Sequence, residues 1–130
     1  MKKNILIIDD DPRVLNSLQV ILENQYHITS VQNATKGLNI ILSQDIDLVL
    51  LDIGLPGELN GLEVLKRLKQ SSKKIPVIII SATDSANIVV EAMKLGAFHY
   101  LTKPFKAQAV LLYTAKAFEN KELPEKVLPI

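Results

Sequence analysis

Short apolar segments alternate along the chain with longer stretches in which apolar residues recur every three or four positions. The short segments are rich in isoleucine, valine and leucine and are continuous, which is typical of strands buried on both faces of a parallel sheet. The second segment shows this pattern more weakly than the others. Five strands are predicted, at residues 5–8, 27–31, 48–51, 77–80 and 98–102.

The stretches between and after these segments predict five amphipathic helices. Asp11 and Asn33 are suitable N-terminal caps for the first two helices, and Gly96 is a suitable C-terminal cap for the fourth. The helices are expected from Pro12 to Leu22, from Asn33 to about Ser43, from about Gly61 through Leu68, from Asp84 to Leu95, and from about Lys106 to Glu122.

Strict alternation of strands and helices predicts an α/β fold in which helices cover both faces of a parallel sheet. The natural topology for five such units is a flavodoxin-like, doubly wound, five-stranded parallel sheet in the order 2-1-3-4-5, with five helices. After residue 122 the chain contains Pro124 and Pro129, which argue against further helix. We therefore expect one domain over residues 1–122, followed by a linker or C-terminal tail at 123–130.

Composition narrows the functional classes. The chain has 130 residues, a formal net charge of +1 and 48% hydrophobic residues, so it is large enough for one core and carries no general attraction for polyanions. No direct binding to nucleic acid is expected. The absence of cysteine excludes disulfides and thiolate chemistry and suits the cytoplasm. The first apolar run is too short for a signal peptide or a membrane span.

Polar residues directly follow four of the five predicted strands. They are Asp9, Asp10 and Asp11 after the first strand, Asp52 after the third, Ser81 after the fourth and Lys103 after the fifth. In an open parallel sheet, ligands bind outside the carboxyl ends of the strands, so these side chains are expected at one edge. Each alone has an ordinary explanation, and for Asp11, which precedes Pro12, a helix cap is the better interpretation. Their joint occurrence indicates a functional site.

Carboxylates crowded at one edge repel one another, and a bound cation relieves the repulsion. Oxygen ligands alone favour a hard ion such as Mg²⁺, which keeps room for phosphate oxygens among its ligands. Lys103 and Ser81 could then neutralise and hydrogen-bond a phosphoryl group, with Asp52 placed as the nucleophile. These residues predict phosphoryl-transfer chemistry.

Four ordered segments carry a resemblance to a known family. They are ILIIDDDP at 5–12, DLVLLDIGLP at 47–56, PVIIISA at 76–82 and GAFHYLTKPF at 96–105. Over residues 4 to about 121 the chain resembles the receiver domains of bacterial response regulators. The resemblance implies that Asp52 is the phosphoacceptor, that Asp10 binds Mg²⁺ directly, that Asp9 assists it, and that Gly54 offers a backbone carbonyl to the metal.

The resemblance also implies a switch. The Ser81 hydroxyl is expected to turn toward the phosphoryl group, Tyr100 to move inward behind it, and Lys103 to complete the site, with a cis peptide bond before Pro104. The phosphodonor would be a sensor histidine kinase or a phosphotransfer protein. The face formed by residues 84–95, 98–102 and 106–122 would bind a partner or form a homodimer, and would control an output domain in the full-length protein.

Other readings stay open. A degenerate receiver would act as an interaction module without phosphorylation. An aspartate-nucleophile phosphohydrolase would need a second acid where Gly54 stands, so catalysis beyond the chain's own phosphorylation and dephosphorylation is not expected. A dinucleotide or flavin binder is set aside, because it would need a glycine-rich turn after the first strand, where the chain has Asp9, Asp10, Asp11 and Pro12. His27 and His99 are interpreted as ordinary surface or edge residues, and the loop between Asp52 and Gly61 is one residue longer than the family spacing.

Overall fold

The computed structural model describes residues 2–83 and 85–122, and side chains as far as residue 119. Strands and helices alternate along this part of the chain. The strands are β1 (Asn4–Ile8), β2 (His27–Val31), β3 (Leu48–Leu51), β4 (Val77–Ser81) and β5 (His99–Thr102). The helices are α1 (Pro12–Leu22), α2 (Ala34–Ser43), α3 (Gly61–Gln70), α4 (Ala86–Lys94) and α5 (Ala107–Glu122).

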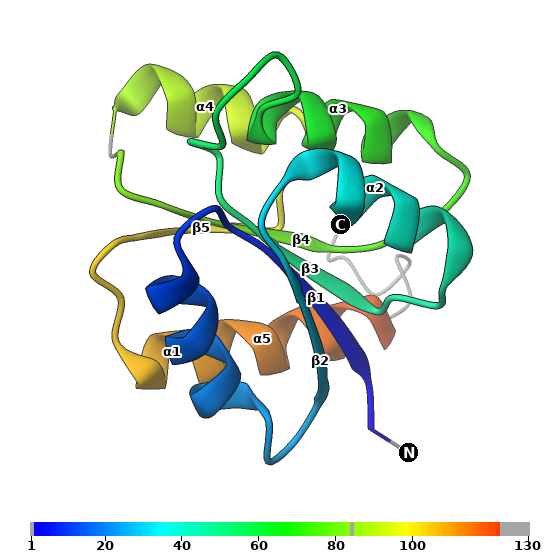
Figure 1. The fold of residues 1–130 in the computed structure, drawn as a ribbon, viewed down its shortest axis with the longest axis vertical. Helices are drawn as coiled ribbons and strands as arrows, with labels where there is room; N and C mark the ends of the chain where they lie inside the picture. Colours follow the sequence, from blue (N-terminus) through cyan, green and yellow to red (C-terminus); the bar gives the residue numbers. More distant parts are fainter. Residues whose placement is uncertain (1, 84, 123–130) are drawn as a thin grey trace, which may run out of the picture.

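The five strands form one parallel sheet in the order β2-β1-β3-β4-β5. Helices α1 and α5 cover one face, and α2, α3 and α4 cover the other (Figure 1). This is a flavodoxin-like doubly wound fold, and the predicted fold class and strand order are confirmed.

Two hydrophobic clusters, one on each face of the sheet, form the core. Along β1, Ile5 and Ile7 pack toward α1 and α5, whereas Leu6 and Ile8 pack toward the three helices on the opposite face. All four residues of β3 are likewise fully buried. Burial of both faces explains why these strands are continuous apolar runs rather than alternating ones.

The structure moves several predicted boundaries by one or two residues. Strand β1 begins at Asn4 rather than at residue 5, β4 ends at Ser81 rather than at residue 80, and α4 ends at Lys94 rather than at Leu95. Helix α4 begins at Ala86, two residues after the expected start at Asp84, and Asp84 itself lies outside the described residues. Strand β5 begins at His99 rather than at residue 98. Gly96 has a φ of +99°, as expected for a helix C-terminal cap. The expected linker or tail at 123–130 lies outside the described residues.

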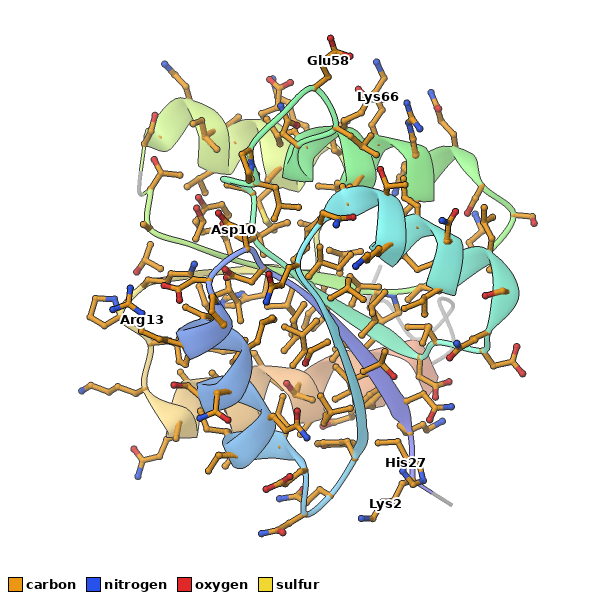
Figure 2. The ribbon with its side chains drawn as sticks, in the orientation of Figure 1. Lys2, Asp10, Arg13, His27, Glu58 and Lys66 are labelled. Atoms are coloured by element: carbon orange, nitrogen blue, oxygen red, sulfur yellow. The ribbon has the colours of Figure 1, made fainter. Side chains whose placement is uncertain are left out.

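The loops after the strands place the polar residues at one edge of the sheet. Figure 2 shows Asp10 at the carboxyl end of β1, at the opposite end of the sheet from Lys2 and His27. Helix α3 lies close against this edge, because a Cβ atom added to Gly61 would come within 2.5 Å of the Asp52 carbonyl oxygen. Within the described residues, no helix combines the length and apolar character needed to cross a membrane.

Candidate functional site

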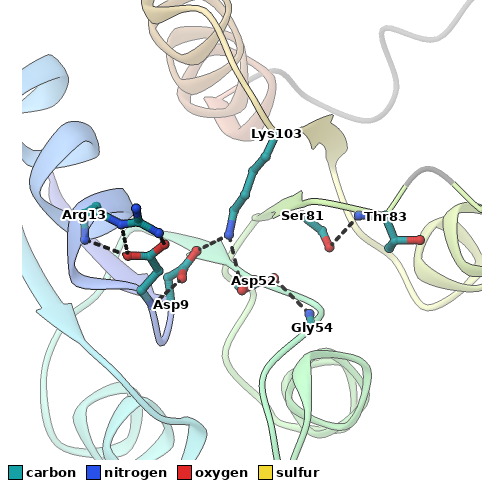
Figure 3. A network of polar contacts seen from close by, with 8 residues as sticks. Asp9, Arg13, Asp52, Gly54, Ser81, Thr83 and Lys103 are labelled. Atoms are coloured by element: carbon teal, nitrogen blue, oxygen red, sulfur yellow. Dashed lines mark hydrogen bonds and ion pairs between the residues drawn. The ribbon is translucent and has the colours of Figure 1, made fainter.

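Asp9 lies at the centre of the polar edge, directly after β1. It is 2% exposed. Its Oδ1 accepts a hydrogen bond from the backbone N–H of Asp11 at 2.8 Å, and its Oδ2 accepts one from the Lys103 ammonium at 2.8 Å (Figure 3). A buried carboxylate is costly unless it is paired, so these two contacts hold the Asp9 side chain in one orientation.

Asp52 faces Asp9 from the end of β3 and is 7% exposed. Its Oδ1 accepts a hydrogen bond from the Gly54 backbone N–H at 2.9 Å, and its Oδ2 lies 3.4 Å from the Lys103 ammonium. Lys103, which follows β5, therefore bridges the carboxylates that follow β1 and β3. Residues far apart in the sequence meet because parallel strands end at the same edge.

The exposed Asp10 completes an acidic cluster. One carboxylate oxygen from each of Asp9, Asp10 and Asp52 lies within 4.8 Å of the others. Three carboxylates and one ammonium leave a net negative charge at this position, and oxygen-only ligands suit a hard divalent cation. The donor set therefore fits Mg²⁺.

Burial and charge shift the protonation of two groups here. Burial raises the pKa of Asp9, although hydrogen bonds from Lys103 and from the backbone of Asp11 oppose this effect. Burial acts to lower the pKa of Lys103, but the hydrogen bond to Asp9 and the charges of Asp52 and Asp9 outweigh it, so the pKa is raised. Lys103 is therefore a fixed positive charge at neutral pH.

A cavity of about 460 Å³ opens beside Asp52. The polar and glycine residues that line it are Asp52, Gly54, Asn60, Ser81, Thr83 and Lys103. The cavity adjoins the acidic cluster through Asp52, which belongs to both. The sequence predicted four of these six positions as site residues.

Asn60 and Thr83 were not predicted as site residues. Asn60 precedes Gly61 at the start of α3, and a cap signal in the sequence could have identified it as a helix cap but not as a cavity residue. Thr83 lies in the loop after β4, where its backbone N–H donates to the Ser81 hydroxyl at 3.4 Å. Whether a residue lines the cavity depends on the paths of the loops after β3 and β4, and residue spacing in the sequence does not predict these paths.

Tyr100 contacts a residue of the cavity wall without lining the cavity itself. Its hydroxyl donates a hydrogen bond to the Thr83 carbonyl at 2.8 Å, so β5 is tied to the loop after β4. The residues that line the cavity do not include Tyr100. The cis peptide bond between Lys103 and Pro104 is confirmed.

Asp11, His27 and His99 were interpreted from sequence as a helix cap and as surface or edge residues, and the structure places them at such positions. Asp11 caps α1 by accepting a hydrogen bond from the Arg13 backbone N–H at 2.9 Å, and it also pairs with the Arg13 side chain. His27 is exposed. His99 lies on the edge strand β5 and stacks on Tyr113, with ring centroids 3.7 Å apart.

Fold and site together define a receiver, and the comparison with known families agrees. The sequence profile of the response regulator receiver domain matches residues 5–123. The chain belongs to this family.

Two curated relatives that the chain matches are longer proteins. Over 111 residues the chain is 41% identical to the uncharacterized transcriptional regulatory protein YkoG of Bacillus subtilis, a match that covers 85% of this chain and 48% of YkoG. It is 34% identical to the nitrogen assimilation regulatory protein NtrX of Azorhizobium caulinodans, over 98% of this chain and 28% of NtrX. The chain thus spans about half or less of the length of these relatives.

Solved structures show the same fold. A CheY-like response regulator receiver domain protein from Methanospirillum hungatei superposes with a TM-score of 0.88 at 29% identity, covering 94% of this chain and 98% of that one. NtrX from Brucella abortus, solved in complex with ADP, gives a TM-score of 0.88 at 31% identity over 98% of this chain and 29% of its own.

Proposed function

We propose that this receiver domain is a phosphorylation-dependent switch in which Asp52 accepts a phosphoryl group from a sensor histidine kinase or a phosphotransfer protein, with Mg²⁺ as the cofactor. The observation that carries the proposal is the meeting of Asp9, Asp10, Asp52 and Lys103 beside one cavity. Family membership supports it, because the chain belongs to the receivers of response regulators.

In the proposed transfer, an Asp52 carboxylate oxygen forms a bond to phosphorus while the bond from phosphorus to the donor breaks, and the leaving group keeps the electron pair. The Gly54 N–H holds Oδ1 of Asp52 at 2.9 Å and so restricts rotation of the carboxylate. Mg²⁺, held by Asp9, Asp10, Asp52 and the Gly54 carbonyl, would supply positive charge to the oxygens of the transferring group.

Lys103 and Ser81 would bind the phosphoryl oxygens that carry the new negative charge. Lys103 lies between Asp9 and Asp52, so a small movement of its ammonium brings it to a phosphoryl oxygen. Ser81 is 2% exposed, and its hydroxyl stands at the cavity wall, where it can donate to a second oxygen. Fixed donors of this kind stabilise the charge of phosphoryl transfer without costly reorganisation.

The conformational change on phosphorylation would involve the loop after β4. When Ser81 turns to the phosphoryl group, its contact with the Thr83 N–H changes, and the Tyr100 hydroxyl bonds to the carbonyl of the same Thr83. Phosphorylation adds close to two negative charges, so the arrangement that satisfies them gains population. Tyr100 would then move inward.

The surface that changes on phosphorylation would be the α4-β5-α5 face, whose strand β5 contains Tyr100. This face has apolar side chains in solvent, because Val90 is 51% exposed, Met93 43% and Leu112 50%. Exposed apolar side chains favour contact with another protein surface. We propose that this face contacts an output domain or a partner, or forms a homodimer. Longer relatives support an output domain in the full-length protein.

The proposal is tested with Mg²⁺ and acetyl phosphate. One phosphoryl group is expected on the wild type, stable in acid and labile in base, as an acyl phosphate should be. Asp52→Asn should abolish it, whereas Asp45→Asn, which changes an exposed carboxylate remote from the cavity, should leave it unchanged. A wild-type protein that takes up no phosphoryl group would contradict the proposal and favour an interaction module that works without phosphorylation.

A further inference from the structure

Asn60 lines the cavity beside Asp52, yet the mechanism above gives it no task. Its side-chain oxygen caps α3 by accepting a hydrogen bond from the Glu63 backbone N–H at 3.0 Å. Asn33 makes the same contact at the start of α2, where it accepts from the Lys36 N–H at 2.9 Å. Capping alone would therefore explain an asparagine at residue 60, and the two caps form a natural pair for comparison.

The capping contact fixes which way the Asn60 amide faces. The Glu63 N–H is a donor, so the Asn60 atom that meets it must be Oδ1, and Nδ2 is directed away from the start of the helix. Within the described residues, no group accepts a hydrogen bond from this Nδ2. Asn60 is only partly buried and lines the cavity, so a hydrogen-bond donor remains available at the cavity wall.

Close packing keeps this donor near the phosphoacceptor. A Cβ atom on Gly61 would lie 2.5 Å from the Asp52 carbonyl oxygen, so the first turn of α3 touches the Asp52 backbone. Gly54, in the same loop, has no side chain to offer. Apart from the phosphoacceptor Asp52 itself, the β3-α3 loop residues that line the cavity are Ile53, Gly54 and Asn60, and of these three only Asn60 has a polar side chain.

We propose that Asn60 is a phosphoryl-binding residue, whose Nδ2 donates a hydrogen bond, directly or through one water, to an oxygen of the incoming phosphoryl group. The inference rests on the proposed function. Lys103 and Ser81 approach the cavity from β5 and β4, and Asn60 adds a neutral donor from the loop after β3. A hydrogen bond to a charged phosphoryl oxygen is stronger than one between neutral groups, so a donor on this side favours binding of the dianion beside three carboxylates.

The test compares Asn60→Ser with Asn33→Ser in phosphorylation by acetyl phosphate. Serine keeps a capping oxygen in both variants, so their thermal stability should change little and by similar amounts. For Asn60→Ser, the KM for acetyl phosphate should rise about three- to tenfold, as expected for one lost hydrogen bond. The rate at saturation should stay close to that of the wild type, because the lost contact binds ground state and transition state alike. Asn33→Ser should match the wild type in both parameters.

A second pair of variants introduces a negative charge at each of the two positions. Asn60→Asp and Asn33→Asp both keep the capping acceptor, but an aspartate at residue 60 would repel the phosphoryl group, so its KM should rise more than in Asn60→Ser. Beryllofluoride affinity in the presence of Mg²⁺ should fall in the same order. If both Asn60 variants give KM values within about twofold of their Asn33 counterparts, the inference is overturned. A wild type that takes no phosphoryl group would overturn the proposed function, and the inference with it.

Discussion

Polar side chains at the amino-end edge of the sheet bind backbone groups, whereas those at the carboxyl-end edge bind one another as well as backbone groups. At the amino end, the Asp47 carboxylate accepts the Asn4 N–H at 2.7 Å, and the Lys73 ammonium donates to the carbonyls of Ile41 and Gln44. At the carboxyl end, Lys103 bridges two carboxylates, and a third lies beside them.

The difference separates stabilising contacts from functional ones. The Asp47 carboxylate accepts a hydrogen bond from the Asn4 backbone N–H at a strand end, and this contact lowers the free energy of the folded state. The acidic cluster instead gathers like charges, which raises that free energy until a cation or a phosphoryl group with its metal enters. The same sheet therefore has one edge whose polar contacts stabilise the fold and one edge whose crowded carboxylates are stabilised further when a cation binds.

The two lysines give the largest expected contrast. Lys103→Met should slow phosphorylation by acetyl phosphate about 100-fold or more, since it removes the donor that meets the developing charge. Lys73→Met should leave that rate unchanged and lower the stability by about 1 kcal/mol, as expected for lost hydrogen bonds to the end of α2. Initial phosphorylation rates and urea unfolding measure the two effects. A fall of less than about tenfold for Lys103→Met would contradict the assigned role.

Gly61 links the functional edge to the packing of α3. Gly61→Ala places a Cβ against the backbone of Asp52 and Ile53, which must move, so a loss of about 2 kcal/mol and slower phosphorylation are expected. Gly54→Ala is the control, because its Cβ would lie at an ordinary 3.4 Å from the Asp52 carboxylate. Thermal unfolding distinguishes them, and equal stability of the two variants would show that the close approach is unimportant.

The acidic residues should show effects of opposite sign. Without divalent metal, Asp10→Ala should stabilise the fold by about 1 kcal/mol, because it removes one of three neighbouring negative charges. Asp47→Ala should destabilise it by a similar amount, because the Asn4 N–H loses its acceptor. Added Mg²⁺ should raise the melting temperature of the wild type and of Asp47→Ala but not that of Asp10→Ala. The same sign for both aspartates would refute the division between the edges.

The smallest effect concerns pH at the amino-end edge, where His99 begins β5. Burial, helped by the charge of Lys116, lowers the pKa of His99, so the unfolded chain takes up this proton more readily than the folded one. The stability from neutral His99 is present above the unfolded pKa and is lost as pH falls through the folded pKa.

Stability curves at about pH 7.5 and about pH 5.5 test this sign. His99→Gln should lose less stability than the wild type on acidification, by at most about 0.5 kcal/mol after solvent screening. Phosphorylation should not change in His99→Gln, and a variant that loses more stability than the wild type on acidification would contradict the account.

Most of the fold could be predicted from sequence because its signals are strong and local. The buried parts of strands β1, β3 and β4 appear as uninterrupted apolar runs, and Asp11 and Asn33 cap helices as their positions suggest. Helix α4 begins two residues later than the sequence predicts. It starts at Ala86 after Ser85, whose side chain makes no capping hydrogen bond, so no capping contact marks this boundary.

The candidate site was only partly accessible from sequence. Residues that directly follow strands, such as Asp9, Asp52 and Lys103, could be assigned to one edge because the sheet rule fixes where strand ends meet. Asn60 lies eight positions after Asp52, and it reaches the cavity only because the loop folds back and Gly61 packs on the strand end. The hydrogen bond from Tyr100 to Thr83 likewise depends on loop geometry.

The most direct test of the central claim is a structure determined with Mg²⁺ and beryllofluoride, a mimic of the phosphoryl group. The account predicts beryllium bonded to a carboxylate oxygen of Asp52, with Mg²⁺ held by Asp9, Asp10 and Asp52 and with Lys103 turned to a fluorine. Beryllofluoride on any other residue, or Mg²⁺ bound away from these three carboxylates, would contradict it.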